Sequence, residues 1–177
     1  MAVITELNSY HTPSNSVYGL TPGFSAPELR FKRLDNDTAD LNNPIPVPAS
    51  GTNYSWRKYT RLRFTSGLAN GVTALYWFAD AAPADWLGTV SLFVGTTTAV
   101  TIFGTTSDES AQLANTTNAN SYTSASPLTI NSGTVIVAAS VPGFGTQDYV
   151  LQQMGLAFST PAGVKTSRGC KYRYSET

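Results

Sequence analysis

Few side chains in this chain have the types and spacing that catalysis requires. His11 is the only histidine among 177 residues, and a catalytic triad would need a structured acid and nucleophile around it. Asp80 and Asp85 suggest the two carboxylates of a glycosidase, but Pro83 lies between them in one loop, which favours solvated acids. The sequence contains no nucleophile elbow, no paired-histidine zinc motif and no glycine-rich phosphate loop. We therefore expect no catalytic residue and no cofactor.

The run from Asp35 to Asp40 (DNDTAD) is rich in oxygen ligands and raises the question of a calcium site. It does not match an EF-hand loop, because Ala39 and Asp40 occupy the positions of a ligand and the glycine. Pro46 stands where the closing glutamate belongs. A capped turn whose acids offset neighbouring cations is the simpler interpretation, and we expect no bound metal.

A single cysteine cannot form a disulfide within the chain. Cys170 shares strand parity with Tyr172 and Tyr174, which predicts that it lies buried as a small apolar side chain.

Cationic side chains alternate with apolar ones in the segment from Tyr54 to Ser66. Arg61 and Arg63 fall on one side of an extended chain, and Leu62 and Phe64 fall on the other. This period of two predicts a strand with one face in a core and one strongly cationic face.

The same alternation recurs in residues 28–35 and 169–176. We expect these strands to present a cationic face to an acidic partner, with two tryptophans as apolar anchors. The candidate partner-binding residues are Arg30, Lys32, Arg57, Arg61, Arg63, Lys171, Arg173, Trp56 and Trp86.

Charge is divided unevenly along the chain although its formal net charge is zero. Residues 65–164 hold Asp80, Asp85, Asp108, Glu109 and Asp148 and no lysine or arginine, so this segment carries −5 and the flanks together carry +5. A subunit with a positive and a negative part can stack on copies of itself or on an acidic lattice. We expect a homo-oligomer.

Composition predicts an all-β protein. Charged residues make up only 12% of the chain, which is poor material for solvated helices, and short apolar runs alternate with turn residues. We predict a single antiparallel β-sandwich, with a jelly roll as one form it could take, over residues 28–177. Residues 1–27 are predicted to be an extended N-terminal arm, held by a neighbour or by the same subunit.

The strands are predicted at 28–35, 54–66, 72–79, 89–94, 99–103, 128–130, 134–140, 148–159 and 169–176. A hairpin is expected to join 89–94 to 99–103, and another to join 128–130 to 134–140. Residues 105–127 form a long Ser/Thr/Asn-rich loop, which favours a functional or interface-making role.

Two binding alternatives remain open at this point. Trp56, Trp77 and Trp86 could form a sugar-stacking platform, although such rings are more often core or interface anchors. We do not expect nucleic acid as a partner, because the aromatic residues alternate opposite the arginines and leave no stacking surface. No secretory signal or membrane-spanning run is recognisable in the sequence, so no membrane association is expected.

Four sequence stretches carry a resemblance to a known group of proteins. Residues 29–35 (LRFKRLD), 44–48 (PIPVP), 54–59 (YSWRKY) and 171–176 (KYRYSE) resemble structural proteins of tailed-bacteriophage virions. The similarity covers about the first third of the chain and its last strands. It implies a non-enzymatic β-sandwich subunit of a head or tail, located in the virion and assembled in the host cytoplasm.

The resemblance implies in particular a capsid decoration (cement) protein that stabilises the head through contacts with the major capsid protein and with its own copies. The alternative it leaves open is a tail, neck or fibre component with a receptor- or carbohydrate-binding sandwich.

Overall fold

The computed structural model describes residues 4–11, 16–20, 31, 44–66, 71–99, 111–138, 143 and 145–176. Along the chain the strands are β1 (Ile4–His11), β2 (Ser16–Leu20), β3 (Thr52–Tyr54), β4 (Lys58–Ser66), β5 (Val72–Ala79), β6 (Val90–Thr97), β7 (Thr117–Asn118), β8 (Leu128–Val137), β9 (Tyr149–Ala157) and β10 (Cys170–Glu176). Two single-turn 3-10 helices, η1 (Ala84–Trp86) and η2 (Ala119–Ser121), lie between strands.

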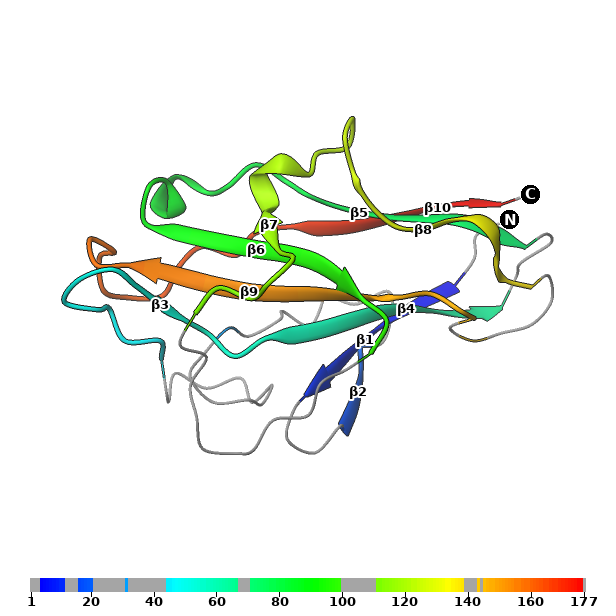
Figure 1. The fold of residues 1–177 in the computed structure, drawn as a ribbon, viewed down its shortest axis with the longest axis horizontal. Coiled ribbons are helices and arrows are strands. Elements are labelled where there is room, and N and C mark those ends of the chain that lie inside the picture. Colours follow the sequence, from blue (N-terminus) through cyan, green and yellow to red (C-terminus); the bar gives the residue numbers. More distant parts are fainter. Residues whose placement is uncertain are drawn as a thin grey trace.

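These strands form two antiparallel sheets that pack face to face, so the predicted all-β sandwich is confirmed (Figure 1). The larger sheet has the order β2-β1-β4-β9-β6-β7, with β3 also paired to β9, and the smaller has the order β10-β5-β8. The long strands β4, β5, β6, β8, β9 and β10 alternate between the two sheets in chain order. A jelly roll places eight strands in two Greek keys, whereas the described strands divide seven to three.

Strand β4 shows the predicted alternation. Leu62 and Phe64 are buried at 7% and 0% exposure, and they face the smaller sheet, where the Phe64 ring meets Tyr174 edge-on at 5.3 Å. Thr60 shares their parity, and its hydroxyl bonds to the Tyr172 hydroxyl across the sandwich at 2.6 Å. These contacts fix which face of β4 lies in the core.

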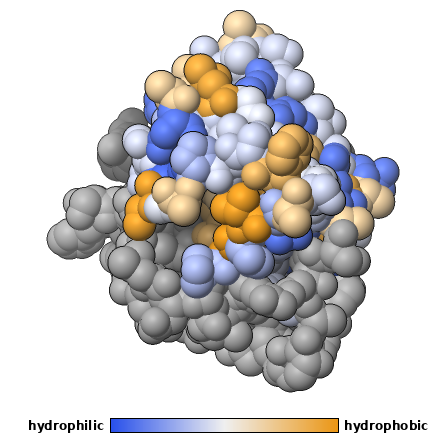
Figure 2. Space-filling model, turned by 90° about the vertical axis from the view of Figure 1, so that its left-hand side faces the viewer, coloured by the Kyte–Doolittle hydropathy of each residue, from blue (hydrophilic) through white to orange (hydrophobic). Residues whose placement is uncertain are grey.

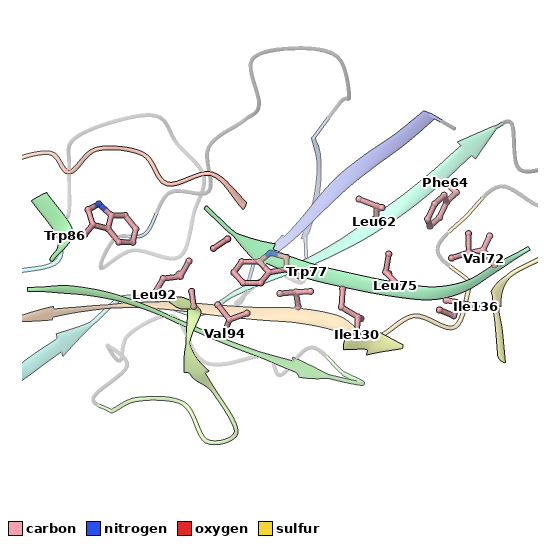
Figure 3. Close-up of a cluster of buried hydrophobic side chains, with 14 of the residues drawn as sticks. Leu62, Phe64, Val72, Leu75, Trp77, Trp86, Leu92, Val94, Ile130 and Ile136 are labelled. Atoms are coloured by element: carbon pink, nitrogen blue, oxygen red, sulfur yellow. The ribbon is translucent and has the colours of Figure 1, made fainter. Parts of the chain in front are cut away.

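The core fills the space between the two sheets (Figure 3). Trp77 of β5 lies beside Leu92 and Val94 of β6, Leu75 lies further along β5 toward Val72, and all four are buried. Burying such large apolar side chains removes their surface from water, which is the main favourable term in folding.

The outer side of the larger sheet carries a second, smaller apolar cluster. Tyr59 and Leu151 are buried there, with Leu113 and Tyr149 packed against them. The side chain of Gln153 fixes the covering segment, because its Oε1 accepts from the Leu113 backbone N–H at 3.1 Å. Part of the predicted loop 105–127 therefore covers this face of the sheet.

The predicted N-terminal arm contains two strands in its described part. β1 and β2 pair as an antiparallel hairpin, and β1 pairs in turn with β4 from Ile4↔Ser66 to Tyr10↔Tyr59. His11 lies at the end of β1, opposite Ser16. The described part of residues 1–27 thus extends the larger sheet of its own chain.

The predicted continuous strand over residues 54–66 is interrupted. Both β3 and β4 pair with β9. Between the pairs Tyr54↔Gly155 and Lys58↔Gln152, the segment joining β3 to β4 has one residue more than β9, which is a bulge. Ser55 sits in it, donating its backbone N–H to Met154 O at 2.8 Å and accepting the Met154 N–H on its hydroxyl at 3.0 Å.

The predicted hairpin of 128–130 and 134–140 is wrong. Residues 128–137 form one strand, β8, whose register against β5 shifts between Val72↔Val137 and Ala74↔Ser132. Three extra residues of β8 are accommodated in that shift, which lies between Ser132 and Val137. The Asn-Ser-Gly sequence at 131–133 therefore continues the strand instead of forming a turn.

Several predicted features lie outside the described residues. Of the predicted strand 28–35, the structure describes Phe31 alone, which packs partly buried against the core. The predicted strand 99–103 is described only at residue 99, and the acidic run 35–40 is not described.

Candidate functional site

One end of the sandwich gathers loops from both sheets, and we call residues 44–51, 80–89 and 158–169 the loop end. Strand pairing brings them together, since Cys170 pairs with Ala79, Val90 with Leu156, and Thr52 with Ala157. This is the left-hand end in Figure 1.

Four large apolar side chains stand exposed on these loops, and Val47 is the least accessible of them at 39%. Leu87, Phe158 and Val164 have 66%, 61% and 77% of their surface accessible. Figure 2, which faces this end, shows hydrophobic residues interspersed with hydrophilic ones. Single exposed apolar residues are common on proteins, but a group of them with polar neighbours is typical of protein–protein interfaces.

Hydrogen bonds hold the loops of this end to one another. The Trp86 indole Nε1 donates to Thr166 O at 2.9 Å, and Asp85 Oδ2 accepts the Thr166 backbone N–H at 2.8 Å. The Phe158 N–H donates to Gly51 O at 3.0 Å. The exposed side chains therefore project from loops with fixed positions, which lowers the entropic cost of binding.

The two carboxylates considered for catalysis both make structural contacts. Asp80 forms an ion pair with Lys171 at 2.5 Å, and the Asp85 carboxylate binds the backbone of Thr166. They tie the loop 80–89 to the segment leading into β10. This arrangement favours a structural role for both acids over a glycosidase pair.

Arg168 is the cation that this end positions most firmly. Its Nε donates to the backbone oxygen of Asp80 at 2.9 Å, and its guanidinium lies over the Trp86 ring, 6.0 Å from the centroid. Burial lowers the pKa of the Arg168 guanidinium, and the nearby Asp80 carboxylate partly offsets that effect. The neighbouring Lys165 donates to Pro161 O at 2.6 Å.

The predicted cationic residues do not form one face. Arg61 lies on the outer side of the larger sheet, over the Tyr149 ring at 4.5 Å. Lys171 and Arg173 alternate with the inward Tyr172, and so they lie on the outer side of the smaller sheet. Arg173 there lies over the Tyr76 ring at 5.1 Å.

The remaining predicted cations divide as follows. Arg57 is half-buried in the bulge between β3 and β4, and Arg63 belongs to β4. Arg30 and Lys32 lie outside the described residues.

The tryptophans are packed inside the chain. Trp56, Trp77 and Trp86 are 5%, 0% and 4% exposed. Their rings leave little surface for a sugar or for a partner protein, so Trp56 and Trp86 serve the fold of their own chain in place of the predicted anchoring role. Trp86 contributes indirectly, as the ring beneath Arg168.

The prediction that Cys170 is buried is wrong, because Cys170 is an exposed residue. It shares parity with Tyr172 and Tyr174 but lies at the first position of β10, where the sandwich core ends. Its thiol nevertheless lies among neighbouring atoms, and their desolvation raises its pKa to about 11.

A buried polar cluster crosses the middle of the core. The Thr60 hydroxyl bonds to Tyr172, and it accepts from Gln152 Nε2 at 3.2 Å. Within the described residues, Gln152 Oε1 and Trp77 Nε1 are buried without a hydrogen-bond partner. Desolvation at this position raises the pKa of the Tyr172 hydroxyl, and its hydrogen bond to Thr60 partly offsets the rise.

The described ranges contain neither a metal-type cluster nor a membrane-spanning helix. No three His, Cys, Asp or Glu side chains there come together in a group that could hold a metal ion. Nor does any helix in those ranges have the length and apolarity needed to cross a bilayer.

Comparisons of the chain with protein-family models, with curated proteins and with solved structures find no match.

Sequence reasoning missed the residues that define the loop end. Leu87 and Val164 stand in turn-rich segments where periodicity gives no signal. Phe158 falls within the predicted strand 148–159, just beyond the observed end of β9 at Ala157. Isolated large apolar residues within turn-rich segments are the pattern that could have indicated them, because such positions seldom reach a core.

Proposed function

We propose that this chain is a non-enzymatic structural subunit of a tailed-bacteriophage virion, and that it acts as a capsid decoration (cement) protein. The observation that carries the proposal is the loop end, where Leu87, Phe158 and Val164 are exposed on hydrogen-bonded loops. Exposed apolar side chains with polar neighbours on a hydrogen-bonded support suit stable docking onto another protein.

Three further features support the same function. The sequence stretches noted above resemble virion structural proteins, the low content of charge favours association, and the acids Asp80 and Asp85 are engaged in holding loops. In this proposal the major capsid protein is the main partner, and contacts between copies of the chain add to the stability of the head.

Quantitative mass spectrometry of purified virions from the phage that carries this coding sequence tests the proposal. Hundreds of copies per particle are expected for a capsid decoration protein. A dozen or fewer would point instead to a neck, tail or fibre component, and complete absence from the particle would contradict a virion role.

The receptor- or carbohydrate-binding alternative loses its main structural basis, because the Trp86 ring is buried and covered by Arg168. A glycan array probed with the full chain checks this directly. We expect no glycan whose binding is lost on Trp86→Ala.

A further inference from the structure

The strongest recognition element at the loop end is the guanidinium of Arg168, which is held at two points. Its Nε is hydrogen-bonded to Asp80 O, and its guanidinium carbon lies over the Trp86 ring, 6.0 Å from the centroid. An arginine fixed in this way has already lost much of the side-chain freedom that binding normally removes.

The terminal nitrogens of Arg168 remain available. A guanidinium has five N–H donors, and within the described structure the hydrogen bond of Arg168 uses only the one on Nε. The nearest acids are committed elsewhere, since Asp80 pairs with Lys171 and Asp85 binds the Thr166 backbone. The edge of the guanidinium beyond Nε thus presents parallel donors that meet no acceptor in the part of the chain that the structure describes.

Two exposed apolar side chains belong to the same hydrogen-bonded loops as Arg168 and Trp86. Leu87 follows Trp86, on which Arg168 rests, and Val164 begins the segment that Thr166 ties to the same tryptophan. Both apolar side chains are highly exposed. A partner surface broad enough to cover Leu87, Val164 and Arg168 together removes water from the guanidinium.

Removing water from a charged guanidinium is unfavourable unless the partner supplies an opposite charge. A purely apolar partner surface would therefore bind poorly here. A carboxylate matches the geometry of the parallel donors and accepts both at once, which gives the strong bidentate form of the pair.

We propose that the partner protein places the carboxylate of an aspartate or glutamate side chain against Arg168, within an apolar surface that covers Leu87 and Val164. This inference rests on the proposed docking role of the loop end and specifies the chemistry of the partner. Lys165, the adjacent cation, adds to the attraction for an acidic surface without fixing its orientation.

The test uses the full chain labelled for NMR and two short probes, acetyl-Leu-Glu-Leu-amide and acetyl-Leu-Gln-Leu-amide. The glutamate peptide should shift the Arg168 Nε–H resonance and the methyl resonances of Leu87 and Val164. We expect it to bind about tenfold more tightly than the glutamine peptide, because only its ionised group forms the charged pair.

Arg168→Gln should abolish the difference between the two peptides, and Arg168→Lys should retain only part of it because a lysine lacks the planar fork. Arg173→Gln is the matched control, since Arg173 also lies over an aromatic ring but on the smaller sheet. It should leave the difference intact. An unchanged Thr166 amide resonance shows that the loops keep their positions in each variant.

Equal shifts from both peptides, or an undiminished preference for glutamate in Arg168→Gln and Arg168→Lys, would overturn the inference. Neither result depends on virions. If the glutamate preference is found but the chain is absent from particles, the inference stands and the proposed virion function fails. If the chain is abundant on particles but shows no glutamate preference, the proposed virion function stands and the inference fails.

Discussion

At the scale of single residues, side chains form hydrogen bonds with backbone groups that lack a backbone partner. Gln147 is the clearest case. Its Oε1 accepts the Leu62 N–H at 3.0 Å and its Nε2 donates to Leu62 O at 2.5 Å, so one amide side chain replaces a backbone pair. Along this edge of β4, the backbone pairs include Thr60↔Val150 before Leu62 and the Phe64↔Gly143 bridge after it. Gln147, 4% exposed, joins the two.

Gln147→Leu should lower the free energy of unfolding by about 2–4 kcal/mol, because it leaves the buried N–H and C=O of Leu62 unpaired. Chemical denaturation measures the change. Gln112→Leu is the control, since among the described residues exposed Gln112 bonds only to Thr116, and it should cost less than about 0.5 kcal/mol. Equal costs for the two variants would refute the structural role of Gln147.

Gly145 is required for a steric reason. It has φ +58°, and a Cβ built on it would lie 1.8 Å from the backbone oxygen of Ile136. Gly145→Ala should therefore destabilise the fold by more than about 3 kcal/mol. Gly51 has φ +71° and open space around it, so Gly51→Ala should cost only about 1 kcal/mol. Thermal denaturation of the two variants tests the difference.

The raised pKa of Tyr172 predicts how the free energy of unfolding depends on pH. Because its pKa is raised in the folded state, the folded chain keeps the proton that the unfolded chain loses first. Its contribution is fully present below the unfolded pKa of about 10 and declines as pH rises above that value. Denaturation between pH 8 and 11 should show this loss, and Tyr172→Phe should reduce it. A Tyr172→Phe variant with the same slope would contradict the assignment.

At the scale of elements, the sequence predicted strands well where alternation is strict. The predicted range 72–79 coincides with β5, and the predicted C-terminal strand differs from β10 by one residue. The positions at which strands are interrupted were not predicted correctly. The bulge at Ser55 and the irregularity within β8 depend on which strand pairs alongside, and periodicity in a single segment carries no such information.

The loop end is held by side-chain bonds that no local pattern predicts. Asp85→Ala should release the Thr166 N–H, and hydrogen exchange at Thr166 should become about tenfold faster. Asp148→Ala removes an acid at the start of β9, away from the loop end, and should leave that exchange unchanged. Unaltered exchange in Asp85→Ala would show that this bond does not hold the loop.

At the scale of the whole molecule, charge separation along the sequence does not become a single charged face. The two sheets place Arg61 on one outer side and Lys171 and Arg173 on the other, so strand parity gave the direction of each side chain correctly within its strand. It could not show that β4 and β10 belong to different sheets. Sheet membership depends on long-range pairing, which the sequence pattern does not show. Because β4 and β10 lie in different sheets, the loop end and not the cationic strands is the candidate interface.

The strands at the N-terminus also change how assembly should be tested. Deleting residues 1–27 would remove β1 and its pairing with β4, and so would damage the sheet itself. Loss of attachment after that deletion would not distinguish an arm from a folding defect. Leu87, Phe158 and Val164 belong to no described core cluster, so substitutions of these exposed residues are the better choice.

The most direct test of the account is occupancy of purified capsids by the variant Leu87→Ser, Phe158→Ser, Val164→Ser, measured by cosedimentation beside the unaltered chain. We predict at least a tenfold loss of binding with an unchanged β-rich circular dichroism spectrum, since the proposed interface buries these three exposed apolar side chains. Val135→Ser, an exposed apolar change on β8, should bind normally. Full occupancy by the triple variant would contradict docking through the loop end.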